Sequence, residues 1–419
     1  MIKSAGLLII KNNKALLVKP KTVNSDNNWS IPKGIIDGKD KNIIETAIRE
    51  TFEETGILIP QQKIDTSKRS IISYVDSKGL LTKIIFYFIV EISDEDYIEY
   101  KISERFDVSE IETFDFFPFR EARKKIYWKQ QSVLNFLKPD SFCINELEEL
   151  IRLGYIYKVK HPTFPLWLYN ITRKCKLYRN WNYTTLSCRG LILDESGKIV
   201  ARPFKKFFEK KDIHQEILDI LPENKVITEK LDGALGILYT YKNNHYICCK
   251  NNFNHYSGVI ATDIFYNDFY PLEFPEIKDH TFLFEIISSK IPFTINYSIK
   301  DSIIPIGIID NATIRNNFSV LDHFGKLEIT TENVLSEGFV EFYADGTMIK
   351  NKSKDFMEEY KLFKKSKKRK FYADFESSSH NLLDRKKVID HSTINILKNF
   401  EDFSNSIILN YQEKIIYWI

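Results

Sequence analysis

The segment Arg49–Gly56 constrains the fold of this chain more than any other. It reads Arg-Glu-Thr-Phe-Glu-Glu-Thr-Gly, and apolar residues recur at helical spacing through Ile43–Thr55. Glu50, Glu53 and Glu54 are spaced i, i+3 and i+4, so their carboxylates lie on one face of a predicted helix that the final glycine closes. Like charges on one face repel each other. A hard cation such as Mg²⁺ or Mn²⁺ would relieve that repulsion.

An acidic helix face is by itself more often a solvated surface than a metal site. The neighbouring residues favour the metal site: Trp-Ser-Ile-Pro-Lys-Gly at Trp29–Gly34 precedes the helix, and an aromatic stretch, Phe114–Pro118, follows it. Pro-Lys-Gly together with Arg-Glu-x-x-Glu-Glu-x-Gly resembles the Nudix box, whose family cleaves nucleoside diphosphates linked to another moiety. The resemblance spans residues 1–138.

The Nudix resemblance implies that Glu50, Glu53 and Glu54 bind divalent metal, Mg²⁺ or Mn²⁺. Glu53 is also placed among the catalytic residues, and Arg49 would hold the glutamates by ion pairing. The metal would stabilise charge on the pyrophosphate and lower the pKa of the attacking water. Which carboxylate acts as the general base is left open by the sequence.

The loop before this helix departs from the family spacing. That spacing would place glycine at Ile35 and glutamate at Lys41. The loop therefore looks one residue longer here, with Gly34 and Asp40 as the nearest matches.

Helix, strand and turn signals divide the chain into three predicted domains: 1–138, 139–360 and 361–419. We expect an α+β multidomain protein with an N-terminal Nudix α/β/α sandwich, a nucleotidyltransferase (ligase) fold of mostly antiparallel sheets with helices, and a small helical C-terminal segment. The elements expected in the first domain are a hairpin at Gly6–Val18, the helix at Ile43–Thr55, strands at Arg69–Val75 and Leu80–Ile92, and a basic amphipathic helix at Arg120–Leu137.

A second motif, Lys-x-Asp-Gly, lies at Lys230–Gly233 between two strand-like runs. Alone it is weak, because most such tetrapeptides would be strand ends. It belongs, however, to an ordered series of short motifs. The series reads Arg189-Gly190, Arg202-Pro203-Phe204-Lys205-Lys206-Phe207-Phe208, Lys230–Gly233, Lys250, Phe284-Glu285, Glu337-Gly338 and Lys350-Asn351-Lys352.

This order resembles the covalent nucleotidyltransferases, and closely resembles the RNA ligase 1 family of T-even phage tRNA-repair ligases. The similarity extends from Tyr155 to Tyr360, with Leu168–Trp181 similar to the aromatic N-terminal stretch of that family. Glu209 departs from the pattern, because the family usually has asparagine there.

The ligase resemblance implies that Lys230 attacks the α-phosphorus of ATP and forms a lysyl-AMP, with Mg²⁺ bound nearby. A lysine amine ordinarily has a pKa of about 10.4 and must lose its proton before it attacks, which neighbouring cations favour. Gly233 would leave room for the nucleotide, and Asp232 would orient the lysine or the metal. The resemblance assigns catalytic roles to Lys230, Asp232, Lys350 and Lys352, and cofactor contacts to Arg189, Lys206, Phe207, Glu229, Gly233, Lys250, Glu285, Glu337 and Gly338.

Two other functions stay open for the second domain. The same lysine chemistry serves GTP-dependent capping guanylyltransferases, although the Arg-Pro-x-x-Lys-Phe-Phe element favours a ligase. The domain could also be a non-catalytic RNA-binding module that delivers RNA to the Nudix site. Lys350 and Lys352, which alternate on one predicted strand, would alone be typical of a solvated face.

Charge limits where nucleic acid can bind. Lysine and arginine number 60 against 57 aspartate and glutamate residues, so a polyanion contact must be local. The run Tyr360–Tyr372 holds seven basic residues and four aromatic ones, a combination that suits an RNA groove. A solvated basic helix or a nuclear address would produce the same run.

The cysteine and hydropathy patterns predict a cytoplasmic protein. The five cysteines are an odd number without a Cys-x-x-Cys pair, which fits a reducing compartment. The longest strongly apolar stretch, Ile84–Val90, is far below the roughly 20 residues needed to cross a bilayer. We also expect no signal peptide.

Together the motifs predict an enzyme with two activities. An RNA ligase of this chemistry needs a 5′-monophosphate, and a Nudix enzyme can convert a diphosphate-linked 5′ end into one. The integrated hypothesis is an RNA end-healing and sealing enzyme whose partners are RNA ends and a nucleotide substrate. Hydrolysis of free dinucleoside polyphosphates by the first domain is equally compatible with the sequence.

Overall fold

The computed structural model of the protein describes residues 1–21, 28–103, 107, 109–269, 279–288, 293–295, 297, 301–311, 316 and 335–365. Packing divides the chain into a compact unit Met1–Phe356 and a second unit Met357–Ile419. The beginning of the basic run is helical, within a helix over 354–365. The rest of the run, and the expected C-terminal helices, lie outside the described residues. The predicted limits at 138 and 360 stay predictions.

The N-terminal sheet is the central layer of a sandwich, and both of its faces are buried. Its strand order is β4-β5-β1-β2-β6, with β3 also paired to β1, and all pairs are antiparallel except β1 with β5. Alternate residues of β1 therefore enter two separate cores, Leu7 and Ile9 on one face and Leu8 and Ile10 on the other. The strands are β1 (Ile2–Lys11), β2 (Lys14–Pro20), β3 (Lys33–Ile35), β4 (Arg69–Val75), β5 (Leu81–Ile92) and β6 (Ile111–Pro118).

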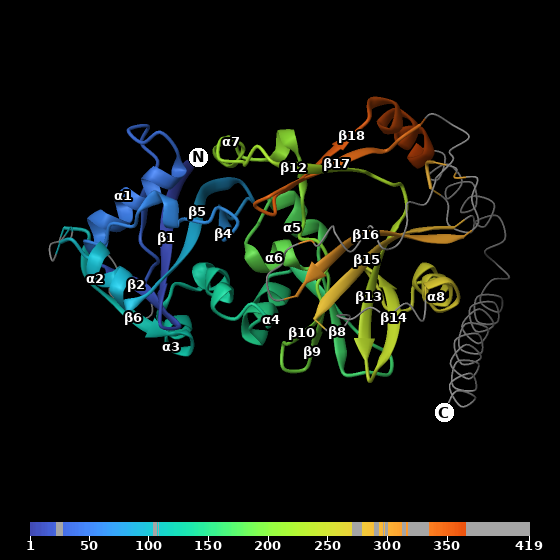
Figure 1. The fold of residues 1–419 in the computed structure, drawn as a ribbon, viewed down its shortest axis with the longest axis horizontal. Helices are drawn as coiled ribbons and strands as arrows, with labels where there is room; N and C mark the ends of the chain where they lie inside the picture. The colour runs from blue at the N-terminus through green and yellow to red at the C-terminus, as the bar shows by residue number, and fades with distance from the viewer. Residues whose placement is uncertain are drawn as a thin grey trace, which may run out of the picture. The chain divides into compact units, whose positions relative to one another are not determined.

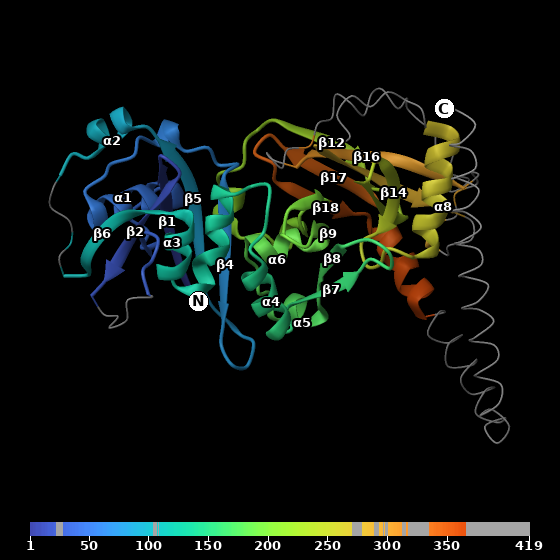
Figure 2. The same cartoon turned by 90° about the horizontal axis from the view of Figure 1, so that it is seen from below.

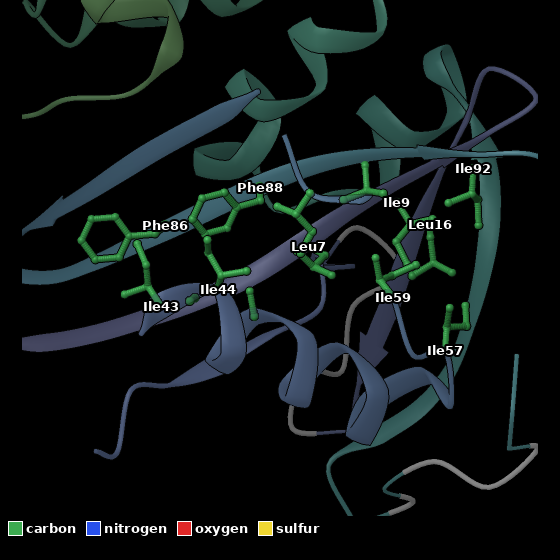
Figure 3. Packing of buried hydrophobic residues seen from close by; sticks show 14 of the residues in the cluster. Leu7, Ile9, Leu16, Ile43, Ile44, Ile57, Ile59, Phe86, Phe88 and Ile92 are labelled. Atoms are coloured by element: carbon green, nitrogen blue, oxygen red, sulfur yellow. The ribbon is translucent and has the colours of Figure 1, made fainter. Parts of the chain in front are cut away.

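Helix α1 (Ile43–Thr55) covers one face of this sheet, and its apolar residues join those of β1 and β5 (Figures 1 and 3). Asn42 caps its start by accepting the backbone N–H groups of Ile44 and Glu45. Gly56 ends it in the left-handed region at φ 69°. The predicted helix and its glycine cap are confirmed, as is the α+β class.

The other face of the sheet is covered by two short elements where one long helix was expected, so the prediction of a helix at Arg120–Leu137 was wrong. The chain forms α3 (Phe119–Lys125) and then a 3₁₀ segment, η2 (Trp128–Leu137). Between them Trp29 pairs with Ile126: the N–H of Trp29 donates to Lys125 and the N–H of Tyr127 donates to Trp29. This pairing with a distant segment holds Ile126 extended and interrupts the helix.

The remainder of the first unit contains three four-stranded sheets, antiparallel apart from the pair β11–β18 (Figures 1 and 2). Side chains from all three sheets share one apolar core, to which Ile192, Ile237 and Phe342 each contribute from a different sheet. The sheets are β10-β9-β8-β7 (Ile199–Ala201, Arg189–Asp194, Leu166–Ile171, Ile156–Lys160), β11-β18-β17-β12 (Phe208–Glu209, Met348–Lys352, Gly338–Tyr343, Lys225–Glu229) and β14-β13-β15-β16 (Asn244–Cys249, Ala234–Tyr241, His280–Ile287, Ser302–Asp310).

The remaining helices connect or cover these sheets. All five cysteines are free thiols. Among the residues that the structure describes, no helix has the length and apolar character that a membrane span needs. The connecting and covering helices are α2 (Asp94–Tyr100), α4 (Ile144–Arg152), α5 (Arg173–Tyr178), α6 (Tyr183–Ser187), α7 (Gln215–Leu218) and α8 (Tyr256–Ile264), with shorter turns η1 (Gln61–Lys63), η3 (Lys210–Asp212) and η4 (Phe265–Phe269).

Candidate active sites

Arg49 organises the acidic face of α1. Its Nη1 atom lies 2.8 Å from Glu50 Oε1 and 3.1 Å from Glu53 Oε2. Its Nε and Nη2 atoms bond the carboxylate of Asp40 in the preceding loop, with the shortest distance 2.9 Å. The longer loop thus still supplies an acidic partner for this arginine, at Asp40.

Glu54 points away from Arg49 and into the protein. It is 6% exposed, and its Oε2 accepts the backbone N–H of Lys33 at 3.1 Å. Burial raises the pKa of Glu54 to about 7, against a lowering by the charge of Lys33 and a raising by Glu50 and Glu110. Burial also raises the pKa of Glu50. A cation placed between these carboxylates would favour their charged forms.

Gly34 leaves the space that Glu50 fills. A Cβ atom on Gly34 would lie 1.7 Å from Glu50 Oε2, closer than any side chain allows. The glycine of the Pro-Lys-Gly motif is therefore needed so that strand β3 can pass directly over the first glutamate of the helix.

The three glutamates fit a divalent cation by their chemistry, since all are hard oxygen donors. Burial disfavours the charged forms of Glu50 and Glu54, whereas Glu53 is exposed. Their present geometry does not converge on one point, because Glu50 and Glu53 turn toward Arg49 while Glu54 turns toward Lys33. Accordingly, within the described part of the chain, no group of three or more His, Cys, Asp or Glu side chains has the arrangement of a metal site.

A second site is centred on Lys230, directly after strand β12. Its Nζ lies 2.7 Å from Glu337 Oε2, and the Nζ of Lys352 lies 2.7 Å from the other oxygen, Oε1. Glu337 is 4% exposed, so its carboxylate is a buried bridge between two amines. The backbone N–H of Lys230 also donates to the carbonyl of Gly338 at 2.9 Å.

Gly338 permits this arrangement. It has φ 129°, and a Cβ atom there would lie 1.9 Å from the carbonyl oxygen of Asn351. The close approach of β17 to β18 brings Glu337 next to Lys352.

The Lys-x-Asp-Gly turn packs against strand β15, residues 293–295 and Tyr297. The N–H of Gly233 donates to Glu285 Oε1 at 3.0 Å, and a Cβ on Gly233 would lie 2.7 Å from Glu285 Cγ. Asp232 accepts the backbone N–H groups of Thr294 and Ile295. In this structure Gly233 leaves the space that Glu285 occupies. The hydrogen bonds from Thr294 and Ile295 to Asp232 hold a neighbouring loop in place.

Burial raises the pKa of Glu285 to about 7, with the charge of Lys230 opposing this rise. Tyr297, which carried no sequence signal, lies beside the same turn and its hydroxyl accepts the N–H of Asp232 at 2.8 Å. Glu110, near Glu50 and Glu54 in the first site, was likewise missed, because it comes from a loop far along the chain.

Four cations, Arg189, Lys206, Lys250 and Lys350, lie close to one another in this site. Arg189 lies 4.9 Å and Lys350 5.9 Å from the ring of Phe207. Burial, together with the charges of Lys350 and Arg189, lowers the pKa of Lys206 to about 7. Burial also lowers the pKa of Lys250, which lies near Arg189 and Glu285. Burial and mutual repulsion disfavour the charged forms of these cations. A bound polyphosphate would stabilise those charged forms.

The remaining predicted residue, Glu229, is exposed at the end of β12. Its recorded partner is Ser336 Oγ, at 3.5 Å. The structure thus brings most of the predicted lysine-site residues together and leaves Glu229 at the edge.

Two family models match this chain: one for the NUDIX domain at residues 2–136, and one for an RNA ligase at residues 187–268. The asymmetrical bis(5′-nucleosyl)-tetraphosphatase of Rattus norvegicus is 32% identical over 111 residues, which are 25% of this chain and 73% of the rat protein. The corresponding Mus musculus protein is 31% identical over the same shares. This chain belongs to the Nudix family.

Solved structures are similar to part of this chain as well. A Caenorhabditis elegans Ap4A hydrolase binary complex has 21% identity and a TM-score of 0.26, covering 36% of this chain and 98% of that one. A NUDIX hydrolase from Nitrosomonas europaea has 23% identity and a TM-score of 0.23, covering 30% of this chain and 76% of that one. The second family model shows that this Nudix protein also carries an RNA ligase family domain. Both domains belong to families of enzymes.

Proposed function

We propose that this protein joins RNA ends bearing a 5′-phosphate and a 3′-OH, through a lysyl-AMP that Lys230 forms with ATP. The observation that carries the proposal is the buried carboxylate of Glu337, which binds the amines of Lys230 and Lys352 at 2.7 Å each. A nucleophile held in one position beside phosphate-binding cations needs little further ordering before it reacts. The match to the RNA ligase family at residues 187–268 supports the same reaction.

In the first step the Nζ atom of Lys230 forms a bond with the α-phosphorus of ATP, and the bond from that phosphorus to the bridging oxygen breaks. Pyrophosphate leaves with the electron pair. The amine gives up a proton, for which Glu337 Oε2 lies within hydrogen-bond distance. An oxygen of the RNA 5′-phosphate would then attack the phosphorus of the lysyl-AMP, the bond from that phosphorus to Nζ would break, and the lysine amine would be released. The RNA 3′-OH would next attack the 5′-phosphorus of the adenylylated RNA and lose its proton, and AMP would leave as the phosphodiester forms.

The cations around Phe207 would serve the leaving group. Arg189, Lys206 and Lys350 lie near one another, and together they would stabilise the negative charge that develops on the departing pyrophosphate. Mg²⁺, when bound, would neutralise further phosphate charge. Glu285 would contact the ribose, and Lys250 would contact the nucleotide. Asp232 would act by holding Thr294 and Ile295 through their backbone N–H groups.

For the Nudix domain, taken as residues 1–138, we propose metal-dependent hydrolysis of a nucleoside polyphosphate. Glu50, Glu53 and Glu54 would hold Mg²⁺ or Mn²⁺, which would polarise the pyrophosphate and acidify the attacking water. The raised pKa of Glu54 supports a cation there, because its charge is otherwise poorly compensated. The names of the rat and mouse relatives make dinucleoside tetraphosphates the first substrates to test.

The two activities would act in sequence on RNA if the Nudix domain also cleaves a diphosphate-linked 5′ end. The ligase could then seal the 5′-monophosphate that results. Separate incubations with a diphosphate-linked RNA and with a free dinucleoside tetraphosphate distinguish these uses. Cleavage of the free nucleotide alone would overturn the sequential version and leave two independent reactions.

The ligase proposal is tested with a single-stranded RNA that carries a 5′-phosphate and a 3′-OH, incubated with ATP and Mg²⁺. The wild-type chain should yield circular or joined RNA, and Lys230→Ala should yield neither. Unjoined RNA with both proteins, in the presence of a folded chain, would contradict the ligase function and favour an RNA-binding module.

A further inference from the structure

The sheet that leads to Lys230 is attached to the Nudix domain at one end. Its strands β12, β17 and β18 pair in a fixed register: Lys225 lies opposite Tyr343 at one end, and Glu229 lies opposite Phe339 at the other. Gly338 lies opposite Lys352 at that second end. Lys230, Glu337 and Lys352 are therefore together at one end of the sheet. The turn 344–347 and the start of β12 are at the opposite end.

Arg69 of Nudix strand β4 binds that opposite end. Its Nη1 lies 2.6 Å from Asp345 Oδ2, and its Nη2 donates to the hydroxyl of Thr347, so the guanidinium holds the turn between β17 and β18. The side chains of Arg69 and Asp345 are 13% and 4% exposed. Because water is largely excluded, this ion pair has a fixed geometry that a surface pair would lack.

A second attachment comes from the connection between β11 and β12. Ile217 of α7 belongs to the same buried core as Phe86 of Nudix strand β5, and His214 packs its ring edge against Phe86 at 5.9 Å. Glu216 forms an ion pair with Lys3 of β1. Helix α7, which precedes β12, thus packs into the hydrophobic core of the Nudix domain.

A third contact joins β4 to the element that carries Lys206 and Phe207. The N–H of Ser73, on the outer edge of β4, donates to the carbonyl of Trp181 at 2.9 Å. The Trp181 ring packs edge-on against Phe208 at 5.3 Å. The Arg69 contact lies at the end of the sheet remote from Lys230, and β12 spans the interval of about 15 Å at roughly 3.3 Å per residue. The Trp181 contact instead reaches β11, where Phe208 lies opposite Ile349 of β18.

From these contacts we propose that the Nudix domain positions the ligase nucleophile, and that Arg69 is the positioning residue of this attachment. The inference rests on the proposed function of Lys230. Arg69 acts through Asp345 and the rigid pairing of β17 and β18, which fixes where Glu337 and Lys352 hold the lysine amine. This role is separate from the hydrolytic chemistry of the Nudix domain.

The attachment predicts a specific kinetic signature. Lys230, Lys350 and Lys352 lie on or next to the attached sheet, whereas Arg189, Lys250 and Glu285 lie on or next to the other two sheets. Loss of the attachment should therefore slow bond formation without weakening ATP binding. A general loss of folding would instead reduce the amount of active protein and both enzymatic activities.

The test compares Arg69→Ala, Asp345→Ala and the double variant in the full chain, with α-labelled ATP in single-turnover assays. Arg152→Ala is the matched control, because Arg152 forms an exposed ion pair with Glu149 on α4. We expect each attachment variant to slow lysyl-AMP formation by ~10- to 100-fold, a range consistent with an ångström-scale displacement of the lysine. The half-saturating ATP concentration and the rate of Nudix hydrolysis should change by less than about twofold. Because Arg69 and Asp345 act as a pair, the double variant should form lysyl-AMP no more slowly than either single variant.

If the wild-type chain takes up label and Arg69→Ala forms lysyl-AMP as fast as Arg152→Ala, the role of Arg69 is overturned. The proposed ligase function is not affected by that result. Parallel loss of ligase and Nudix activities in Arg69→Ala would also overturn it, because the arginine would then be merely structural. A wild-type chain that takes up no label would overturn the proposed ligase function, and this inference with it.

Discussion

Lys230 and Lys352 bind opposite oxygens of the same buried carboxylate, that of Glu337, at 2.7 Å each. One carboxylate thus fixes the spacing of the nucleophile and of a second amine. Lys230 directly follows β12 and Lys352 ends β18, so the geometry exists only when β12 and β18 are paired on either side of β17.

Replacing Glu337 by glutamine should remove this bridge. The amide has the same shape but lacks the charge that two amines share, so we expect lysyl-AMP formation to fall by ~100-fold. Single-turnover labelling measures the rate. Glu195→Gln, at an exposed turn, is the matched control, and equal rates in the two variants would contradict a role for the bridge.

Gly34→Ala should inactivate the Nudix site and spare the ligase site. The added Cβ would lie 1.7 Å from Glu50 Oε2, so this carboxylate must move. We expect hydrolysis of a dinucleoside tetraphosphate to fall by ~100-fold, with lysyl-AMP formation retained in the same preparation. Normal hydrolysis by this variant would remove Glu50 from the proposed metal set.

Stability in EDTA should depend on pH through Glu54, whose folded-state pKa is raised from 4.5 to about 7 by burial. Between these values the folded chain binds more protons than the unfolded chain. Glu54 therefore destabilises the fold progressively as pH rises from about 4.5 to about 7, by up to roughly 3 kcal/mol.

Glu54→Gln should abolish that contribution. The difference in unfolding free energy between the variant and the wild type should grow from pH 5 to pH 8 in denaturant titrations. Adding Mg²⁺ at pH 8 should stabilise the wild type and not the variant. Parallel pH profiles for the two proteins would show that Glu54 is not the buried titrating carboxylate.

Local signals predicted the parts of the fold that local interactions determine. The helix at Ile43–Thr55 followed from apolar spacing and a terminal glycine, and the structure has both caps. The expected helix at Arg120–Leu137 failed because Trp29, about a hundred residues earlier, pairs with Ile126 and interrupts it. A contact at that separation leaves no mark in helical periodicity.

The sequence indicated which residues would gather in each site, but it did not indicate which of them would contact each other. The order of short motifs predicted a cluster around Lys230, and Glu337 lies beside the lysine. The motif did not reveal that a Cβ on Gly233 would also lie 2.7 Å from Glu285 Cγ, within the protein itself. The predicted room for a nucleotide at Gly233 stays a prediction. The partnership of Arg69 with Asp345 had no sequence signal, since neither residue belongs to a recognisable motif.

The nucleotide preference separates a ligase from a capping enzyme. We expect label from α-labelled ATP, and not from α-labelled GTP, to remain on the denatured wild-type polypeptide. Transfer from GTP alone would favour the guanylyltransferase alternative for the same lysine.

The most direct test of the account is covalent labelling of the purified full chain with α-labelled ATP and Mg²⁺, beside Lys230→Ala. The account predicts label that survives denaturation on the wild type and none on the variant, with Nudix hydrolysis equal in both. Absence of label on both folded proteins, or equal label on both, would contradict the assignment of Lys230 as the nucleophile.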